Sequence, residues 1–451
     1  MSIYLFLFAR PGNTITRSNT YNNPPPDRTN MNFNALASSA AEAATDATEG
    51  LTFAGIPVAF ILFAFTLLGV AIFHYHTLRV ALIGLAVITA YKLIFSTFGG
   101  VPGLAGLWQH LGHEWVILTN LFGLLVGFAL LADHFERSHL PQWLPAILPD
   151  NWRGPATLLV LVFCMSTFLD NIAAAIIGGT IAASVFRHKV HIGFLAAIVA
   201  ASNAGGAGSV VGDTTTTMMW IEGVSPLDVA HAFLPAGVAL AVIAIPASLM
   251  QQRMSPIVCD PPADLRLDWA RVAIVAAILG AVISANVIVN TYYTEVADNF
   301  PFLASAVWIT IIVMSPWRAP NWKLLPMASL GSLFLIALVT CASMMPVESL
   351  PAASWPTTLG LGFVSAVFDN IPLTKLALEQ GGYDWGALAF AVGFGGSMVW
   401  FGSSAGVALS TQFPQAKSVF YWLRYGWFVP LAYVAGYTVL ILLLGWHPTP
   451  R

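Results

Sequence analysis

The chain has 451 residues, of which 57% are hydrophobic and only 9% are charged, and its formal net charge is −3. A soluble domain carries about 25% charged residues, so this composition excludes an ordinary soluble protein and predicts a membrane protein. There is no basic or acidic run of the kind that binds nucleic acid, and the three cysteines (Cys164, Cys259 and Cys341) are too scattered for a disulfide framework or a metal cluster.

The first 50 residues differ from the rest of the chain. The stretch "RSNTYNNPPPDRTN" is polar and proline-rich, which predicts a disordered N-terminal tail over residues 1–50. Met31 offers a second candidate start codon within this tail, and the functional interpretation does not depend on which start is used.

Apolar runs long enough to cross a bilayer, roughly 17–25 residues each, occupy most of the remaining chain. The clearest cover residues 51–73, 78–98, 115–132, 228–250, 269–289, 323–341 and 427–446, and interrupted runs cover 155–186, 192–221, 301–314 and 355–411. Hydropathy therefore predicts an all-α membrane protein with about 10–13 transmembrane segments. A polar connecting loop at 251–268 separates an N-terminal membrane half (51–250) from a C-terminal membrane half (269–451).

An internal repeat links the two halves. The segment "STFLDNIAAAIIGG" begins at Ser166 and "SAVFDNIPLTKLAL" begins at Ser365, so each half places an Asp-Asn pair inside an apolar run. A glycine-rich stretch follows each pair, "SNAGGAGSVVGDTTTT" from Ser202 and "GFGGSMVWFGSSAG" from Gly393. Each stretch contains two glycines, five further residues, and then a glycine followed by a hydroxyl or an acid.

Loop charge indicates how the two repeats are oriented. The loop after the first Asp-Asn segment (187–191) is basic, whereas the loop after the second (379–384) is acidic. Because cytoplasmic loops favour Lys and Arg, equivalent loops are expected to face opposite sides of the membrane. The pattern predicts two inverted repeats.

The glycine-rich breaks indicate where a ligand would bind. Glycine interrupts a membrane helix and frees backbone groups, which are tolerated only inside protein or beside a water-filled cavity. Interrupted segments at matching places in two halves are typical of a transporter binding site at mid-membrane. The alternative is that the glycines only allow helices to pack closely.

Polar side chains cluster in these motifs. A carboxylate at mid-membrane costs at least about 2.5–3.5 kcal/mol, so the acids inside the repeats are functional candidates. The candidate cation- and proton-binding residues are Asp170, Asn171, Ser202, Asn203, Asp213, Thr214, Thr215, Thr216, Ser365, Asp369, Asn370, Ser397, Ser403 and Ser404. All of them offer oxygen, the donor that hard cations prefer, so the set predicts an alkali-cation site. A carboxylate that binds either a cation or a proton can exchange one for the other.

Two interpretations of single residues stay open. Each of the three aspartates has an alternative role as a helix N-cap, because an acid before an apolar helix is a common cap. Lys375, inside the second Asp-Asn segment, could pair with an acid, contact an anionic substrate, or extend its ammonium to the membrane surface, and the last is favoured.

Other functional classes have little support. There is no G-x-x-x-x-G-K-[ST] loop, so no nucleotide is expected as a partner. The histidines lie mainly in expected loops, and no nucleophile–base pairing or metal-ligand spacing indicates an enzyme or a bound cofactor.

The motifs "STFLDN", "SNAGGAGSVVGDTTTTMMW", "SAVFDNIP" and "GGSMVWFGSSAGVA" together resemble those of the NhaD-type sodium/proton antiporters. These belong to an ion-transporter superfamily that also holds arsenite permeases and sodium-coupled citrate and dicarboxylate transporters. The resemblance runs from about Trp115 to Trp446.

The resemblance implies two inverted repeats with re-entrant hairpins and interrupted helices, a scaffold region, and a homodimer in membrane lipid. It further implies exchange of Na⁺ or Li⁺ for H⁺ by an elevator-like movement, in a bacterial inner membrane. The family's polar residues would correspond to Asp170, Asn171, Asn203, Asp213, Thr215, Thr216, Ser365, Asp369, Asn370, Ser397 and Ser403.

Lys375 departs from the pattern expected of such an antiporter, in which an apolar residue would stand at this position. The alternative function is therefore a Na⁺- or H⁺-coupled carrier of a carboxylate or of an inorganic anion such as arsenite. Lys375 and the N-termini of broken helices would then attract the anion. Three acids beside the site argue against this alternative, because an anion would meet their field.

Overall fold

The computed structural model describes residues 50–449 except for the short stretches 74–75, 259–265 and 294–298. The tail expected over residues 1–50 lies outside the described residues, apart from its last position. The described strands form two short hairpins, in which β1 (Thr52–Phe53) pairs with β2 (Ile56–Pro57) and β3 (Thr97–Phe98) pairs with β4 (Val101–Pro102). Nearly all other regular structure is helical, so the expected all-α class is confirmed.

Five helical segments of the described chain are long and apolar enough to cross a membrane: Thr77–Phe95, Gly103–Glu136, Pro226–Met254, Trp269–Val289 and Trp322–Ser343. A sixth is obtained if α20 (Val419–Tyr425) and α21 (Phe428–Leu443), which meet at a bend of 59°, count as one span. The interrupted apolar runs of the sequence form shorter helices instead. Those at 155–186, 192–221 and 355–411 belong to the two repeats, and the run at 301–314 forms α14 (Phe302–Met314).

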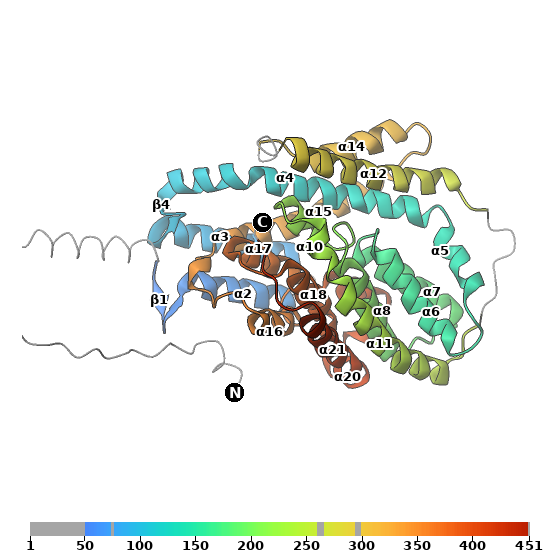
Figure 1. The fold of residues 1–451 in the computed structure, drawn as a ribbon. Helices are drawn as coiled ribbons and strands as arrows, with labels where there is room; N and C mark the ends of the chain where they lie inside the picture. Colours follow the sequence, from blue (N-terminus) through green and yellow to red (C-terminus); the bar gives the residue numbers. More distant parts are fainter. Residues whose placement is uncertain (1–49, 74–75, 259–265, 294–298, 450–451) are drawn as a thin grey trace, which may run out of the picture.

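Four helices form what we call the scaffold group: α4 (Gly103–Glu136), α12 (Trp269–Tyr292), α14 (Phe302–Met314) and α15 (Leu325–Ser343). α12 and α14 pack against each other and against α4, and they form the upper layer in Figure 1. α15 packs on the other side of α4 and also contacts α3 (Thr77–Phe95), which pairs with α2 (Val58–Ile72). The scaffold group therefore presents α4 and α15 to the rest of the protein.

The two repeats contain the same series of helices. In the first repeat these are α6 (Arg153–Ser166), α7 (Asn171–Val185), α8 (Ile192–Ala207) and α9 (Thr214–Ile221), followed by α10 (Pro226–Ala230) and α11 (Phe233–Met254). In the second they are α16 (Trp355–Ser365), α17 (Asn370–Gln380), α18 (Trp385–Gly395) and α19 (Ser404–Gln412), followed by α20 and α21. We call α6–α9 and α16–α19 the core group. Short connecting turns complete the chain: α5 (Leu140–Trp143), η1 (Leu144–Ile147), η2 (Trp322–Leu324), η3 (Val347–Ser349), η4 (Gly396–Met398) and η5 (Pro414–Lys417).

The repeats run in opposite directions. α7 of the first repeat packs alongside α19 of the second, and α9 packs alongside α17. In the first pair, Thr180 Oγ1 in the C-terminal half of α7 accepts a hydrogen bond from Gln412 Nε2 at the last residue of α19 (3.0 Å). In the second pair, Lys375 in the middle of α17 forms an ion pair with Glu222, which directly follows α9 (2.6 Å). Since α7 and α17 are equivalent helices, this crossed pairing is the arrangement expected of inverted repeats.

Glycines at equivalent positions let the broken helices approach their neighbours. A Cβ on Gly205 would collide with the carbonyl oxygen of Phe163 in α6, and a Cβ on Gly395 would collide with that of Gly362 in α16. Gly402, in the turn just before α19, is packed as closely, because a Cβ there would meet the carbonyl oxygen of Ala366. The close-packing interpretation of the glycines is therefore correct, and it operates at the same breaks that position the polar residues.

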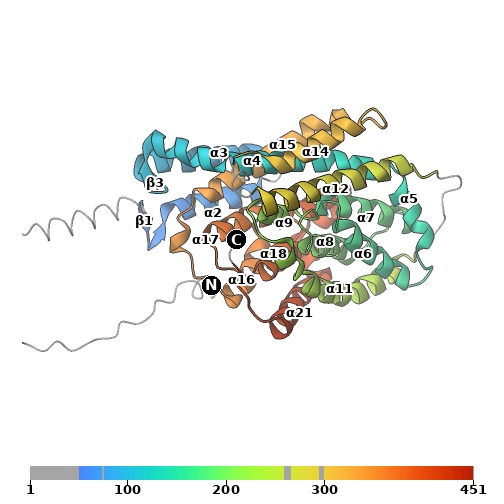
Figure 2. The ribbon, with the colours of Figure 1, turned by 45° about the horizontal axis from the view of Figure 1, so that its top comes forward.

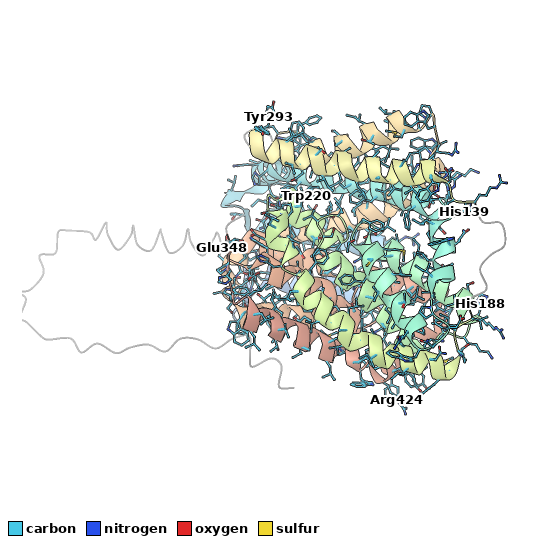
Figure 3. All side chains as sticks on the ribbon, turned by 45° about the vertical axis from the view of Figure 1, so that its right-hand side comes forward. His139, His188, Trp220, Tyr293, Glu348 and Arg424 are labelled. Atoms are coloured by element: carbon cyan, nitrogen blue, oxygen red, sulfur yellow. The ribbon has the colours of Figure 1, made fainter. Side chains whose placement is uncertain are left out.

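The two ends of the helix bundle differ in charge. Figure 3 shows His139 and His188 at one end and Glu348 at the other. The first of these ends also carries exposed basic side chains from the loops and helix ends around it: Arg137, Arg153, Arg187, Lys189, Arg253, Arg318, Lys323 and Arg424. We call it the basic end, and the end near Glu348 the opposite end. Figure 2 shows the same long helices running between them.

A charged pair at the basic end gives a pH-dependent contribution to stability. Asp268, just before α12, accepts a hydrogen bond from Arg318 Nε (2.8 Å), which holds its pKa below the ordinary value. A lowered pKa in the folded state gives stability that is present at neutral pH and is lost as the pH falls through the folded-state pKa. We expect Asp268→Asn to lower the melting temperature by about 1–3 °C at pH 7, and the difference from wild type to shrink as the pH falls below the ordinary aspartate range. Differential scanning fluorimetry would measure this, with exposed Asp150→Asn as the control; a pH-independent difference would contradict it.

Candidate functional site

Four short helices begin near the middle of the protein with a polar residue at the N-cap. Asp170 precedes α7, Asp213 precedes α9, Asp369 precedes α17 and Ser403 precedes α19. The last three accept backbone hydrogen bonds as caps, from Thr215 N (3.1 Å), Ile371 N (3.1 Å) and Gly406 N (3.3 Å) respectively. The capping interpretation of the aspartates therefore holds for Asp213 and Asp369, and Ser403 caps α19 in the same way. It does not describe the side chain of Asp170, which makes no capping hydrogen bond.

Amide side chains join the two repeats where the broken helices cross. Asn171 donates to Asn203 Oδ1 (3.1 Å), and Asn203 in turn donates to Ser397 Oγ (2.9 Å) in the second repeat. Asn370 of the second repeat lies 3.5 Å from Asp213 Oδ1 in the first. These buried contacts bring the two sets of expected site residues into one cluster.

Asp213 lies at the centre of the acids. Its carboxylate interacts electrostatically with Asp170 on one side and with Asp369 on the other. Its side chain is almost completely buried, and a Cβ on Gly393 of α18 would lie 3.1 Å from Asp213 Oδ2, so this carboxylate reaches into the second repeat. The expected gathering of three acids is thus present, and it is drawn from both repeats.

Two of these carboxylates have oxygens left without a partner. Asp170 Oδ1 and Asp213 Oδ2 are buried and make no hydrogen bond within the described protein. Buried polar atoms are nearly always satisfied, because leaving one unpaired costs about 1–3 kcal/mol. Two unpaired carboxylate oxygens in one cluster are what a cation or a proton would satisfy.

The hydroxyl residues of the cluster divide into two groups. Thr214 Oγ1 lies 3.3 Å from Asp213 Oδ1 and Ser404 Oγ lies 3.2 Å from Asp369 Oδ2, so these two extend the acid cluster. The others hold the broken helices in place. Ser202 donates to Val199 O (2.9 Å), Thr216 to Asp213 O (2.9 Å) and Ser365 to Val392 O (2.7 Å). Ser397 and Ser403 accept from Asn203 Nδ2 and Gly406 N, as described above. Thr215, also buried, supplies the backbone N–H that Asp213 caps.

A cavity connects this cluster with the basic end. It has a volume of about 450 Å³ and lies between the scaffold helices α4 and α15 and the core helices α7 and α9. Asp133 and Glu136 line its outer part, and Asp170, Thr214 and Ser404 line its inner part. A second cavity, of about 210 Å³, reaches Asp369 and shares the Ser404 wall. Asp170 can therefore be reached from the basic end of the protein, and Asp369 lines the adjoining smaller cavity.

Comparison with characterised proteins gives relatives of one kind. The chain is 28% identical over 336 residues to a protein named sodium/proton antiporter 1 from Arabidopsis thaliana, a match that covers 65% of this chain and 57% of the relative. It is 26% identical over 306 residues to the Na⁺/H⁺ antiporter NhaD of Vibrio cholerae (55% of this chain, 61% of the relative) and 25% identical over 332 residues to that of Halomonas elongata (63% and 66%). No family model matches the chain.

The chain is related to the NhaD-type sodium/proton antiporters. This confirms the resemblance drawn from the motifs, and together with the apolar helices it makes the chain an integral membrane protein.

The interpretation that Lys375 extends to the membrane surface is wrong. The side chain is completely buried, and its ammonium lies 3.0 Å from Glu114 Oε2, 2.6 Å from Glu222 Oε1 and 2.7 Å from Glu379 Oε1. An ammonium has three N–H donors, and three carboxylates already surround this one. Lys92 is also buried and donates to the carbonyl oxygen of Met344 (2.6 Å), so it does not reach the surface either.

Two acids of the scaffold group line the larger cavity. Helix α4 continues through Glu136 and so places both Asp133 and Glu136 on the cavity wall. Of the cysteines, Cys341 is buried and Cys164 is exposed, and Cys259 lies outside the described residues.

Sequence reasoning missed Ser166 and the three glutamates. The buried Ser166 Oγ has no partner within the described protein, and Ser166 opens "STFLDN" just as Ser365 opens "SAVFDN", so the repeat itself marks it. Glu114 directly precedes the apolar run expected to begin at 115. Helix α4 begins eleven residues earlier, at Gly103, and so carries this acid inside the protein.

Proposed function

We propose that this protein is a secondary transporter that exchanges Na⁺ or Li⁺ for H⁺ at the cluster of Asp170, Asp213 and Asp369. The observation that carries the proposal is the pair of buried, unpartnered carboxylate oxygens on Asp170, which lines the inner part of the larger cavity, and on Asp213, which interacts with Asp170. The names of the relatives support the same exchange. The matched region spans 57% of the first relative's length and 72% of the second's.

A charge estimate favours a monovalent cation over an anion. Each helix N-terminus carries roughly half a positive charge, so the four that meet here contribute about +2. The three ionised aspartates contribute about −3, which leaves the cluster near −1. One Na⁺, Li⁺ or H⁺ would neutralise this charge, whereas an anion would increase it.

Competition between the cation and the proton would couple their movements. A nearby cation stabilises the ionised carboxylate and burial stabilises the protonated one, so each occupant displaces the other. The remaining expected ligands, such as Asn171, Asn203 and Ser397, would hold the carboxylates in place around the ion. This ligand assignment is part of the proposal.

An elevator-like movement is supported by the difference between the two ends. At the basic end a cavity separates α7 and Ser404 of α19 from α4 and α15, whereas near the opposite end α9 packs on α4 and α17 packs on α15. Inverted repeats allow the reverse arrangement, in which the cavity opens at the opposite end. The core group would then move against the scaffold group between the two states.

The setting of the transporter follows from the same features. Cytoplasmic loops favour Lys and Arg, so the basic end would face the cytoplasm and the arrangement described here would be open inward. We also propose a homodimer in a bacterial inner membrane. The Arabidopsis relatives leave organelle membranes as the alternative outcome of localisation.

The exchange can be tested in everted membrane vesicles with a pH-sensitive fluorescent probe. We expect added Na⁺ and Li⁺ to dissipate an imposed acid-inside gradient, and K⁺ to do so at least about tenfold less effectively. Vesicles lacking the protein provide the baseline. The absence of any cation-dependent response in vesicles that contain the folded protein would refute the exchange.

The anion-carrier alternative loses its main support in the structure, because Lys375 is surrounded by carboxylates. Uptake of labelled citrate, succinate or arsenite into proteoliposomes would test it directly. Saturable uptake that requires Na⁺ or an inward proton gradient would replace antiport as the function, and uptake no greater than in empty liposomes would leave antiport in place.

A further inference from the structure

The buried charge cluster around Lys375 is not used by the proposed exchange. Glu114 comes from the scaffold helix α4, Glu222 caps the C-terminal end of α9, and Glu379 lies one turn beyond Lys375 on α17. Glu114, Glu222 and Lys375 have side-chain exposures of 4%, 7% and 0%, so the cluster is closed to water on most sides. It therefore joins one scaffold helix to two core helices, beyond Asp213 and Asp369 in the direction of the opposite end.

The inverted repeat supplies a comparison within the same molecule. Aligning Asp170 with Asp369 makes Ile176 the equivalent of Lys375 and Thr180 the equivalent of Glu379. Aligning Asp213 with Ser403 makes Gln412 the equivalent of Glu222. At the basic end these positions form a neutral pair, Gln412 to Thr180 at 3.0 Å, and Ile176 lines the larger cavity. The boundary between the core group and the scaffold group thus contains a cavity at the basic end and an ion cluster at the opposite end.

We propose that the contact between Lys375 and Glu114 is the latch that closes the opposite end of the transport path. This rests on the proposed alternating-access function and names the residues that hold one of its two states. Lys375 is a positioning residue: it fixes α9 and α17 against α4 and does not contact the transported ion.

The arrangement of charges lets the latch open without stranding a buried ammonium. If the core group moves away from α4, Lys375 keeps Glu222 and Glu379, which move with it. Glu114 alone would lose its partner, and it would then face the newly opened cavity, where water can solvate it. An unpaired charge in a dry interior would be far more costly. A single carboxylate on the scaffold thus decides whether this end is closed.

Cysteine accessibility tests the latch without reference to the transported ion. Met218 in α9 is completely buried, and its repeat equivalent, Ala408, lines the smaller cavity at the basic end. In full-length protein in which Cys164, Cys259 and Cys341 are replaced by serine, Met218→Cys would be labelled in intact cells by a membrane-impermeant maleimide. We expect slow labelling when the latch is intact, and labelling at least about tenfold faster in Glu114→Gln, which leaves Lys375 two carboxylates and so preserves the fold.

Two matched variants separate the latch from a general effect of charge. Glu379→Gln removes a carboxylate on the same helix as Lys375, and Lys92→Met removes a buried lysine that binds a carbonyl oxygen and none of the three glutamates. Neither cuts the link between α4 and α17, so both should label within about twofold of the parent protein.

The outcomes distinguish the latch from the proposed function. Equal labelling rates in Glu114→Gln and Glu379→Gln would overturn the latch, even if the parent protein exchanges Na⁺ for H⁺. Faster labelling in Glu114→Gln alone, in a protein that exchanges no cation, would retain the latch and remove the exchange.

Discussion

Replacing Asp213 or Asp369 with asparagine is expected to reduce cation/proton exchange by roughly a hundredfold or more. Breaking a buried charge interaction costs about 3–5 kcal/mol, and each 1.4 kcal/mol corresponds to a factor of ten. Asparagine keeps an oxygen for the capping hydrogen bonds from Thr215 N and Ile371 N, so folding and membrane insertion should be preserved. Only the negative charge and the exchangeable proton are lost. Initial rates of Na⁺-dependent proton movement in vesicles with matched protein content would measure the effect.

Asp384→Asn provides the matched control. Asp384 also caps a helix, accepting from Ala387 N (2.9 Å), but it stands at the start of α18 and accepts from His447 N (3.1 Å) near the C-terminus. We expect its exchange rate to stay within about twofold of wild type, because distant sites act independently. If Asp213→Asn and Asp369→Asn behaved like Asp384→Asn, the acids would be structural caps and the proton would be carried elsewhere, with Asp170 as the next candidate.

The repeat could be predicted from the sequence because broken helices require particular residue types at particular places. Glycine is needed where the broken membrane helix packs closely on its neighbour, and a capping residue is needed where the next helix begins. Gly205-Gly206 with Asp213, and Gly395-Gly396 with Ser403, record both requirements. The basic and acidic loops after the two Asp-Asn segments also predicted the opposite directions that the pairing of α7 with α19 confirms.

The environment of Lys375 could not be found in this way. Glu379 lies one turn away on the same helix, but Glu114 and Glu222 come from α4 and α9, each more than a hundred residues from Lys375, and no local pattern connects them. A lysine in an apolar segment usually extends to the membrane surface, so the local rule gave the wrong environment. The available signal was the difference between the two repeats, because the position equivalent to Lys375 in the first repeat is an isoleucine, Ile176. A lysine that replaces an apolar residue of the other repeat is not expected to be a simple surface residue.

The hydroxyl-rich segment shows a similar limit. Thr214, Thr215 and Thr216 are adjacent in sequence and look equivalent as ligands. In the structure, Thr214 approaches the Asp213 carboxylate, whereas Thr216 donates to the Asp213 and Ser209 carbonyl oxygens. Which hydroxyl faces the acids is decided by the turn that starts α9, and composition alone does not determine it.

Adding a methyl group at Gly205 or Gly395 is expected to destabilise the protein strongly. The new Cβ would collide with the carbonyl oxygen of Phe163 or of Gly362, and a backbone oxygen cannot rotate away as a side chain can. Overpacking costs about 1–3 kcal/mol or more, so each alanine variant should lower the melting temperature by roughly 5 °C. Thermal unfolding of the purified protein in detergent, followed by size-exclusion chromatography, would measure the change.

Gly360→Ala in α16 separates this collision from the general effect of replacing a helical glycine. A Cβ at Gly360 meets no atom within 4 Å, so this variant should be unchanged or stabilised by up to about 1 kcal/mol, the helix-propensity difference between the two residues. Equal stability of Gly205→Ala and Gly360→Ala would show that α6 can move away from α8 at little cost. The carbonyl contact would then not fix the position of the helix break. The hydrogen bonds between the repeats would instead have to hold Asn203, in the same helix as Gly205, and Asp213, at the end of the turn that follows this helix.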